Sequence, residues 1–233
     1  MAKTPAGLIT QKRLLSTAAR MFLENGYRET GIRQISRETG VAVGCFQENF
    51  KTKEGLLLIL TSAMFDGQFS AARTPRDGEA QSPVYVYALE TAIQLTITEM
   101  HEHLRELYIE AYSLKDTSEY IYRHMAAELQ KLFGGNFPGY TEQDFYELEI
   151  GSAGLMRSYL ARQCDEEFPL EKKLRRFLEA SLRIYRVSET EIAGVIDAVL
   201  SLNLFGIAEK VMQQLFSMLE MKFDFKLSKD SIG

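Results

Sequence analysis

Apolar residues recur at helical spacing along almost the whole chain, and strand-like alternation bounded by turns is scarce. The first such segment, 10–26, ends on a glycine, as helices commonly do. A second helix is predicted from Thr30, a possible N-cap, to Gly40, where it stops. A very short third helix follows over about 42–49, and a fourth begins at Thr52. The sequence therefore predicts an all-α protein that opens with a three-helix head.

Small residues, Pro75, Gly78 and Pro83 make 70–83 the clearest linker in the chain. We place a domain boundary at 52/53, between a small head at 1–52 and a larger helical body at 53–233. Helices in this body are predicted over 84–102, 104–115, 118–133, 141–164 and 170–185, with a last one from the capping sequence at 188–191 to about 223.

The segment 192–208 is apolar nearly all round, with polar residues only at Asp197, Ser201 and Asn203. Such a helix must be buried on more than one side. The helix predicted over 141–164 has the same character. Either a second subunit covers these helices, or they lie in the core of one large monomer.

The 233 residues are 45% hydrophobic and 25% charged, which is ordinary for a soluble globular protein. We find neither an apolar run long enough for a membrane span nor a secretion signal, so we expect a cytoplasmic protein without a membrane partner. Cys45 and Cys164 are far apart and predict free thiols rather than a disulfide.

Charge is unevenly distributed along the chain. Residues 1–60 hold nine Lys and Arg against five Asp and Glu, a net charge of +4, whereas the whole chain has a net charge of −5. A cationic head on an anionic body suggests that the head alone meets a polyanion.

The glycine-containing turn between the second and third helices is typical of a helix-turn-helix. Val41, Phe46 and Phe50 are expected to face inward, and Gly44 keeps the backbone accessible to a partner. The expected outward residues are Val43, Cys45, Gln47, Glu48 and Asn49, with Arg33, Lys51 and Lys53 beside them. Helix pairs of this kind also occur in proteins that never touch DNA, so the pattern alone leaves both readings open.

Residues 10–57 resemble the DNA-binding domain of the tetracycline-repressor (TetR) family of bacterial transcription regulators. The resemblance needs no gap and is carried by Gly26-Tyr27, Thr30, Ile32, Ile35-Ser36, Thr39-Gly40-Val41-Ala42, Gly44, Phe46-Gln47, Asn49-Phe50, Lys51-Thr52-Lys53-Glu54 and Leu56. The chain departs from the family pattern at Ala42, Cys45, Gln47 and Asn49.

The resemblance implies roles for residues of the head. Thr30 and Lys53 would hold phosphates, with Lys51 beside them. The base-edge contacts would come from Arg33, Val43, Cys45, Gln47 and Glu48. It also implies a homodimer, formed through the last two long helices, that binds a pseudo-palindromic double-stranded operator.

For a small-molecule ligand in the body the sequence offers only candidates. These are His101, Tyr108, Tyr112, Phe145, Glu149 and Arg157, each of which could equally be ordinary core or surface. No His/Cys/carboxylate set has metal-ligand spacing, and no phosphate loop or nucleophile elbow occurs in the sequence. We therefore expect no metal, no cofactor and no catalysis.

The preferred hypothesis is a sequence-specific transcriptional regulator, a repressor that a small-molecule effector releases from its operator. The alternative is a helical ligand- or protein-binding module whose head has weakened DNA affinity, favoured by the departures at Ala42, Gln47 and Asn49.

Overall fold

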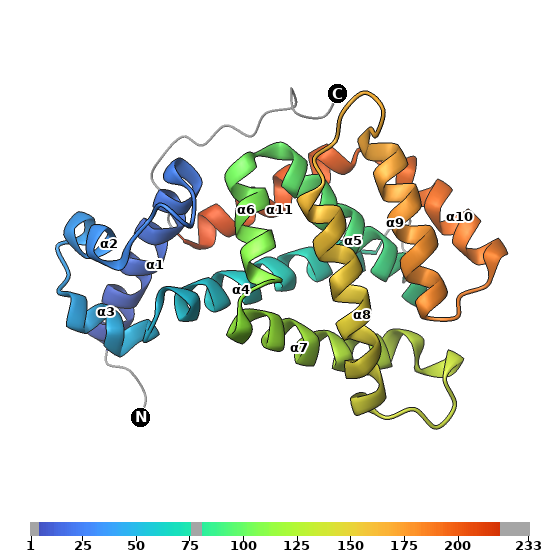
Figure 1. Cartoon of the computed structure of the whole chain (residues 1–233), viewed down its shortest axis with the longest axis horizontal. Coiled ribbons are helices and arrows are strands. Elements are labelled where there is room, and N and C mark those ends of the chain that lie inside the picture. Colours follow the sequence, from blue (N-terminus) through green and yellow to red (C-terminus); the bar gives the residue numbers. More distant parts are fainter. Residues whose placement is uncertain (1–4, 76–80, 220–233) are drawn as a thin grey trace.

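The computed structural model describes residues 5–75 and 81–219, and within these ranges every regular element is helical. Figure 1 shows a small head at one end of the molecule and a larger helical body beside it. The head comprises α1 (Pro5–Asn25), α2 (Ile32–Thr39) and α3 (Val43–Phe50). The body comprises α4 (Lys53–Arg73), α5 (Pro83–Met100), α6 (Glu102–Ala111), α7 (Lys115–Phe133), the 3-10 turn η1 (Gly134–Asn136), α8 (Glu142–Ala161), α9 (Leu170–Ile184), α10 (Glu189–Leu200) and α11 (Leu204–Met218). The prediction of an all-α fold is confirmed.

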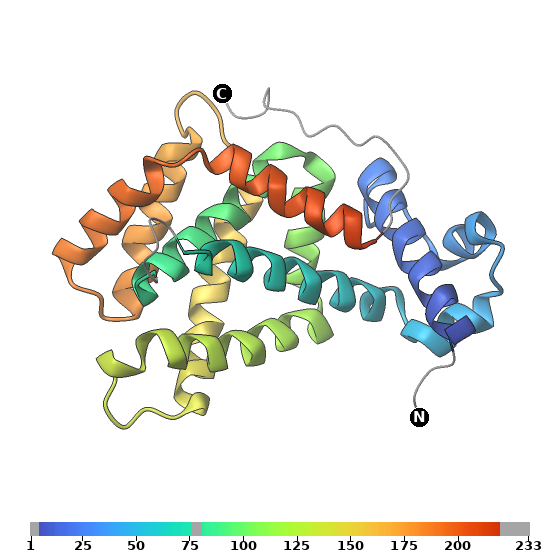
Figure 2. The same ribbon diagram turned by 180° about the vertical axis from the view of Figure 1, so that it is seen from behind.

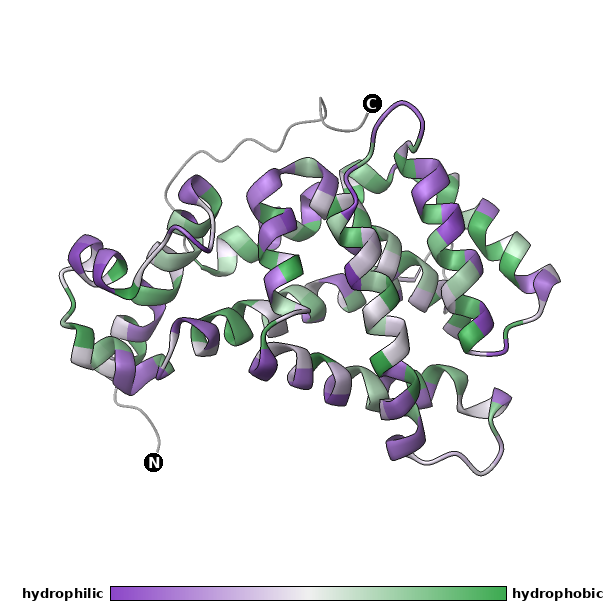
Figure 3. Ribbon diagram, viewed as in Figure 1, coloured by the Kyte–Doolittle hydropathy of each residue, from purple (hydrophilic) through white to green (hydrophobic). Residues whose placement is uncertain are grey.

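Two glycines end the first two helices of the head. Gly26 has φ = +87° and Gly40 has φ = +65°. These left-handed conformations are unfavourable for any L-residue that has a side chain. Between them the chain turns so that Phe22, Ile35 and Phe46 share one fully buried core. In Figure 3 the outward side of α2 is hydrophilic, as expected for a helix that packs through one face.

Helix α4 runs from the head into the body without a break (Figures 1 and 2). Thr52 is its N-cap and accepts a hydrogen bond from Gly55 N–H at 2.9 Å, as the sequence predicted for the start of this helix. The helix is long and apolar enough to cross a membrane by those two measures alone, but half of its most apolar window is buried inside the protein. The division of the chain at 52/53 stays a prediction, because α4 packs against both parts.

Helix α5 is the centre of the body. Every residue from Val86 to Met100 is buried, including the polar Glu90, Gln94 and Glu99. It packs against α4, α6, α7, α8, α9, α10 and α11. A helix covered on all sides has no water for its polar side chains, so each of them must find a partner within the protein.

One prediction about the body is wrong. The expected single helix from 188 to about 223 is two helices, α10 and α11, whose axes differ by 72°. The break falls at 201–203, where Asn203 caps α11 by accepting a hydrogen bond from Gly206 N–H at 3.1 Å. An asparagine side chain competes for backbone N–H groups and so favours a helix start over a helix interior. Residues 220–223, the expected end of that helix, lie outside the described part of the chain.

Of the two alternatives for 192–208, burial on all sides in the core of one monomer does not hold for α10. Ile192, Val195, Ile196 and Val199 of α10 are buried. Ala193, Gly194, Asp197 and Ala198, on the other face of the helix, are exposed in the monomer.

A buried ion-pair network joins four segments of the body. Glu99 and Lys173 are both 0% exposed, and Lys173 Nζ donates to Glu99 Oε1 at 2.7 Å and to the Arg162 carbonyl oxygen at 2.6 Å. The second oxygen of Glu99 accepts from Arg105 at 3.2 Å and from Cys164 N–H at 3.1 Å. The network therefore ties α5 to α6, to α9 and to the α8–α9 loop.

We expect Lys173→Met to lower the free energy of unfolding by about 3–5 kcal/mol, because it leaves part of the Glu99 charge buried and unpaired. Urea unfolding followed by circular dichroism measures the effect. Arg176→Ala is the matched control: it breaks an exposed pair with Glu179 and should cost no more than about 1 kcal/mol. Equal effects of the two variants would contradict the prediction.

Candidate nucleic-acid interface

Helix α3 presents an exposed face and a buried one. Phe46 and Phe50 are 0% and 4% exposed and their ring centroids lie 5.2 Å apart, which confirms the predicted inward residues. Val43, Gly44, Gln47 and Glu48 are exposed on the other side. The face predicted to meet a partner is thus open to solvent.

Cys45 and Asn49 are only half-exposed on this helix. Asn49 Nδ2 donates to the Cys45 carbonyl oxygen at 2.8 Å, so part of its donor capacity is used one turn back along α3. The two cysteines of the chain are free thiols, as expected, with Cys164 buried in the body.

Basic side chains flank the exposed face of α3. Arg33 and Arg37 of α2 and Lys51, directly after α3, are exposed and form no ion pair with any residue in the described ranges. Lys51 has φ = +61°, which is uncommon for a residue other than glycine. Arg37 was not among the predicted residues; its place one turn after Arg33 on the same helix face was the available signal.

Thr30 and Lys53 lie differently from the other predicted residues. Thr30 is 1% exposed, and its hydroxyl donates to the carbonyl oxygen of Gly26 at 2.8 Å. The prediction that Thr30 is the N-cap of the second helix is wrong, because Gly31 takes that position and its N–H is held by the Gln34 side chain at 2.6 Å.

Lys53 is half-buried and connects the start of α4 to the α1–α2 turn. Its Nζ donates to the carbonyl oxygens of Tyr27 at 2.8 Å and Thr30 at 3.1 Å, and it lies 4.2 Å from the centroid of the Tyr27 ring. Burial lowers the pKa of Lys53, although the nearby Glu110 carboxylate opposes the effect. In this conformation Thr30 and Lys53 stabilise the head, and their phosphate contacts stay predictions.

The head contacts the body through α6. Arg28 Nε donates to Glu110 Oε1 at 2.6 Å, and Arg28 N–H donates to Glu106 Oε1 at 2.9 Å. His103 Nδ1 donates to the Leu23 carbonyl oxygen at 2.7 Å. Since α6 also carries Tyr108 and Tyr112 into the core, one short helix touches both the head and the centre of the body.

The structure brings three of the six predicted ligand residues to one region of the body. Tyr108 and Tyr112 are buried, and Tyr112 donates to Gln94 Oε1 at 2.8 Å. Glu149 is also buried and accepts from the Tyr185 hydroxyl at 3.2 Å. The charge of Glu149 is close enough to raise the pKa of Tyr112, after the larger effects of burial and of Glu90.

The other three predicted ligand residues lie elsewhere. His101 is the N-cap of α6, seven residues and so about 10 Å along the helix from Tyr108. Phe145 is buried with its ring centroid 5.5 Å from that of Phe137. Arg157 is exposed and donates to the Ser113 hydroxyl at 2.6 Å.

Sequence reasoning missed Glu90, Gln94 and Gln68, which complete the buried polar cluster. Gln94 Nε2 donates to Glu90 Oε1 at 2.8 Å, and Gln68 Nε2 donates to the Tyr108 hydroxyl. Burial raises the pKa of Glu90 to about 7 and that of Glu149 to about 8. For Glu90 and Gln94 the available signal was a glutamate and a glutamine one helical turn apart within a largely apolar helix.

Comparisons with known proteins agree with this geometry. Residues 14–60 match the family described as "Bacterial regulatory proteins, tetR family". The curated relative YuxN of Bacillus subtilis (strain 168), an uncharacterized HTH-type transcriptional regulator, is 27% identical over 96 residues, which is 41% of this chain and 31% of the relative. YerO of the same organism, also an uncharacterized HTH-type transcriptional regulator, is 40% identical over 48 residues, which is 21% of this chain and 17% of the relative. The chain thus covers less than a third of the length of either relative.

Two solved structures share the fold. RolR in complex with the ligand resorcinol is 19% identical with a TM-score of 0.61, over 83% of this chain and 96% of that one. A TetR-family transcriptional regulator from Pectobacterium atrosepticum is 18% identical with a TM-score of 0.53, over 78% of this chain and 95% of that one.

The head is similar to the helix-turn-helix of bacterial transcriptional regulators. Residues 14–60 are thus similar to the tetR family of bacterial regulatory proteins, and the fold of the chain is similar to that of RolR.

We expect Gly55→Ala to lower the free energy of unfolding by about 1–3 kcal/mol. A Cβ atom at position 55 would lie 2.1 Å from the Phe50 carbonyl oxygen, so the α3–α4 turn must shift. Gly44→Ala is the control, because a Cβ atom there meets nothing within 4 Å, and it should leave unfolding unchanged. Chemical denaturation of both variants measures the difference, and a fully stable Gly55→Ala protein would refute the prediction.

Proposed function

We propose that this protein is a repressor that binds a pseudo-palindromic operator as a homodimer and leaves it when a small molecule binds the body. The observation that carries the proposal is the exposed face of α3, flanked by unpaired basic residues, on a head that matches the tetR family. In a helix-turn-helix protein the exposed recognition helix enters the major groove of DNA, and basic residues beside it contact the phosphates.

Sequence reading would come from the side chains exposed on and beside α3. Gln47 can pair with adenine and Arg33 with guanine, whereas Glu48 can accept from a cytosine amino group. Val43 offers an apolar contact to a thymine methyl group, and Gly44 lets the backbone approach the base edges. Because Asn49 and Cys45 are half-buried and joined by a hydrogen bond, we assign them a supporting role on α3.

The homodimer would form through the exposed faces of α8 and α10. Ile150 of α8 is 46% exposed, and the exposed Gly151 and Gly154 lie beside it with open space where a Cβ atom would point. Gly194 of α10 is exposed in the same way, between Ala193 and Ala198. Small residues around an exposed isoleucine allow close approach of a second helix, and a twofold dimer would place two heads on successive major grooves.

Release by an effector would act through α6. Its buried tyrosines reach the polar cluster of the body, and its glutamates hold Arg28 of the head. A molecule that displaces Tyr108 or Tyr112 would therefore shift the contact between the head and the body. The similarity to RolR, solved with resorcinol bound, supports a small-molecule effector of this size class.

The operator hypothesis is tested by electrophoretic mobility shift and footprinting on the DNA that flanks this protein's own gene. We expect binding at least a thousandfold tighter than to random duplex at physiological salt, with a protected inverted repeat. Equal affinity for both DNAs would overturn the proposal and favour the alternative of a ligand-binding module with a weakened head.

We expect Lys51→Ala and Arg33→Ala to weaken DNA binding in different ways. Loss of a phosphate contact in Lys51→Ala should weaken binding to all sequences and reduce the slope of log K against log salt by about 1. Loss of a base contact in Arg33→Ala should cost about 1–3 kcal/mol on the operator and relax sequence preference at one position. Salt titrations of both variants on operator and random DNA measure these effects. The same salt slope and the same sequence preference in both variants would refute the assignment of Lys51 to a phosphate and Arg33 to a base.

We expect Gly154→Arg to yield a folded monomer, because the arginine has room within its own chain but blocks close approach of a second α8. Gly135→Arg is the control, since position 135 is equally open and lies in the turn before α8. Sedimentation velocity distinguishes the two outcomes. A dimeric Gly154→Arg protein would move the interface away from α8.

A further inference from the structure

Two buried side-chain oxygens at the centre of the body have no hydrogen-bond partner among the described residues. They are Glu90 Oε2 and Gln68 Oε1, and both side chains are 0% exposed. Both residues act on Tyr108: Gln68 donates to its hydroxyl, and the Glu90 carboxyl raises its pKa after the larger effect of burial. Buried acceptors are normally satisfied, so this pair indicates where a bound molecule would supply the missing donors.

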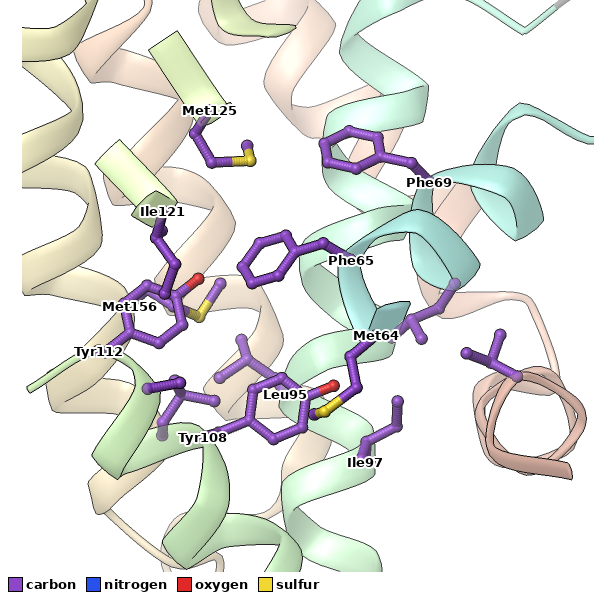
Figure 4. Close-up of a cluster of buried hydrophobic side chains, with 14 of the residues drawn as sticks. Met64, Phe65, Phe69, Leu95, Ile97, Tyr108, Tyr112, Ile121, Met125 and Met156 are labelled. Atoms are coloured by element: carbon purple, nitrogen blue, oxygen red, sulfur yellow. The ribbon is translucent and has the colours of Figure 1, made fainter. Parts of the chain in front are cut away.

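The walls around these acceptors are aromatic and flexible. Phe65 and Tyr112 have ring centroids 6.3 Å apart. Figure 4 shows Phe65 pointing from α4 toward Tyr112 and Ile121, with the flexible side chains of Met125 and Met156 close by. Unbranched methionines change shape to admit a guest, and aromatic faces attract a cation.

The titratable side chains of this region include two buried glutamates. Besides Glu90, the nearby Glu149 is buried, and its pKa is raised first by burial and further by Glu90. Arg73 is the basic side chain that acts on Glu90, and its charge opposes the effect of burial. The other groups facing Glu90 are the amide of Gln94 and the hydroxyls of Tyr87, Tyr108 and Tyr112. A positively charged guest would supply the counter-charge that the cluster lacks, and an anion would be repelled.

Phe69 and Arg73, which lie near this cluster, line a surface cavity. This cavity of about 510 Å³ lies between α4 and α7, with Phe69 among its lining residues. The same ring belongs to the buried group in Figure 4, so Phe69 separates the cavity from the core. Arg73 lies 5.0 Å from the centroid of the Phe69 ring and pairs with Glu128 of α7, so the cavity is spanned by one exposed ion pair.

We propose that the effector is a small organic cation with an aromatic or apolar body, which enters through the α4–α7 cavity past Phe69 and pairs its ammonium group with Glu90. Gln68 accepts a second hydrogen bond from the same group, and Phe65 and Tyr112 cover its apolar part. Because this names the chemical class of the effector, it rests on the proposed function for its consequence on DNA binding.

The test uses the full-length protein and three probes with one shared body: phenethylamine, 2-phenylethanol and phenylacetate. In isothermal titration calorimetry we expect the amine to bind at least tenfold more tightly than the alcohol, and the acid not to bind. Equal affinity for the amine and the alcohol would overturn the inference.

Proton release provides a second readout on the unmodified protein. At pH 6.5 a carboxyl with a pKa of about 7 is mostly protonated, so pairing with the amine should expel a proton; at pH 8.5 it is already ionised and should expel less. Titrations in buffers of different ionisation enthalpy measure this release. Amine binding without proton release at pH 6.5 would contradict the pairing with Glu90.

The variant Glu90→Gln keeps the shape of the side chain and removes its charge. We expect it to lose at least tenfold in amine affinity and to change alcohol affinity less than twofold. Glu179→Gln, which alters an exposed ion pair on α9, is the control and should bind as the unmodified protein does. Unchanged amine affinity in a folded Glu90→Gln protein would overturn the inference.

Measuring operator binding in parallel separates the two proposals. Intact operator binding with no amine affinity would overturn the cationic effector and leave the regulator in place. Amine binding that depends on Glu90 but leaves operator affinity unchanged would support the site and overturn release of DNA by this ligand.

Discussion

The burial of α5 is the constraint on which the body depends. A helix that is covered from Val86 to Met100 cannot hydrate its polar side chains, so the surrounding helices must provide partners. Lys173 and Arg105 donate hydrogen bonds to the Glu99 carboxylate, and the Tyr112 hydroxyl donates to the Gln94 side-chain oxygen. These bonds fix how α6 and α9 lie against the centre. Among the buried side chains of this helix, only the Glu90 carboxyl has an oxygen without a hydrogen-bond partner in the described residues. The proposed ligand therefore binds at Glu90.

Helix α6 connects that centre to the head. Two faces of this helix touch different parts of the protein: His103, Glu106 and Glu110 meet the end of α1 and the turn after it, whereas Tyr108 and Tyr112 enter the core. A rigid helix moves as one body, so a change in the packing of the tyrosines reaches Arg28 without an intervening flexible segment. This placement gives the head and the body a direct physical connection.

Much of the head could be predicted from the sequence, because its signals are local. Gly26 and Gly40 end helices through their own backbone freedom, and Phe46 and Phe50 follow from spacing on one short helix. Lys53 shows the limit: its sequence neighbours place it on an exposed helix start, yet its ammonium group binds two carbonyl oxygens of a turn more than twenty residues earlier. Arg157, a candidate ligand residue, faces solvent because the rotation of α8 is set by its packing against α7 and not by its own composition.

The sequence by itself determined most of the helices, the glycine ends of the first two and the exposed face of α3, since each depends on residues within one or two turns of each other. The helix break at Asn203 also has a local signal, the capping asparagine itself. The apolar residues on both sides of it led to the prediction of one continuous helix. Only the tertiary structure decided which polar residues became buried partners. Glu90, Gln68 and Tyr108 come from three helices, and Glu99 and Lys173 are 74 residues apart. Periodicity reports which face of a helix is apolar, but contacts between distant segments depend on how the helices pack, and these contacts create the candidate effector site.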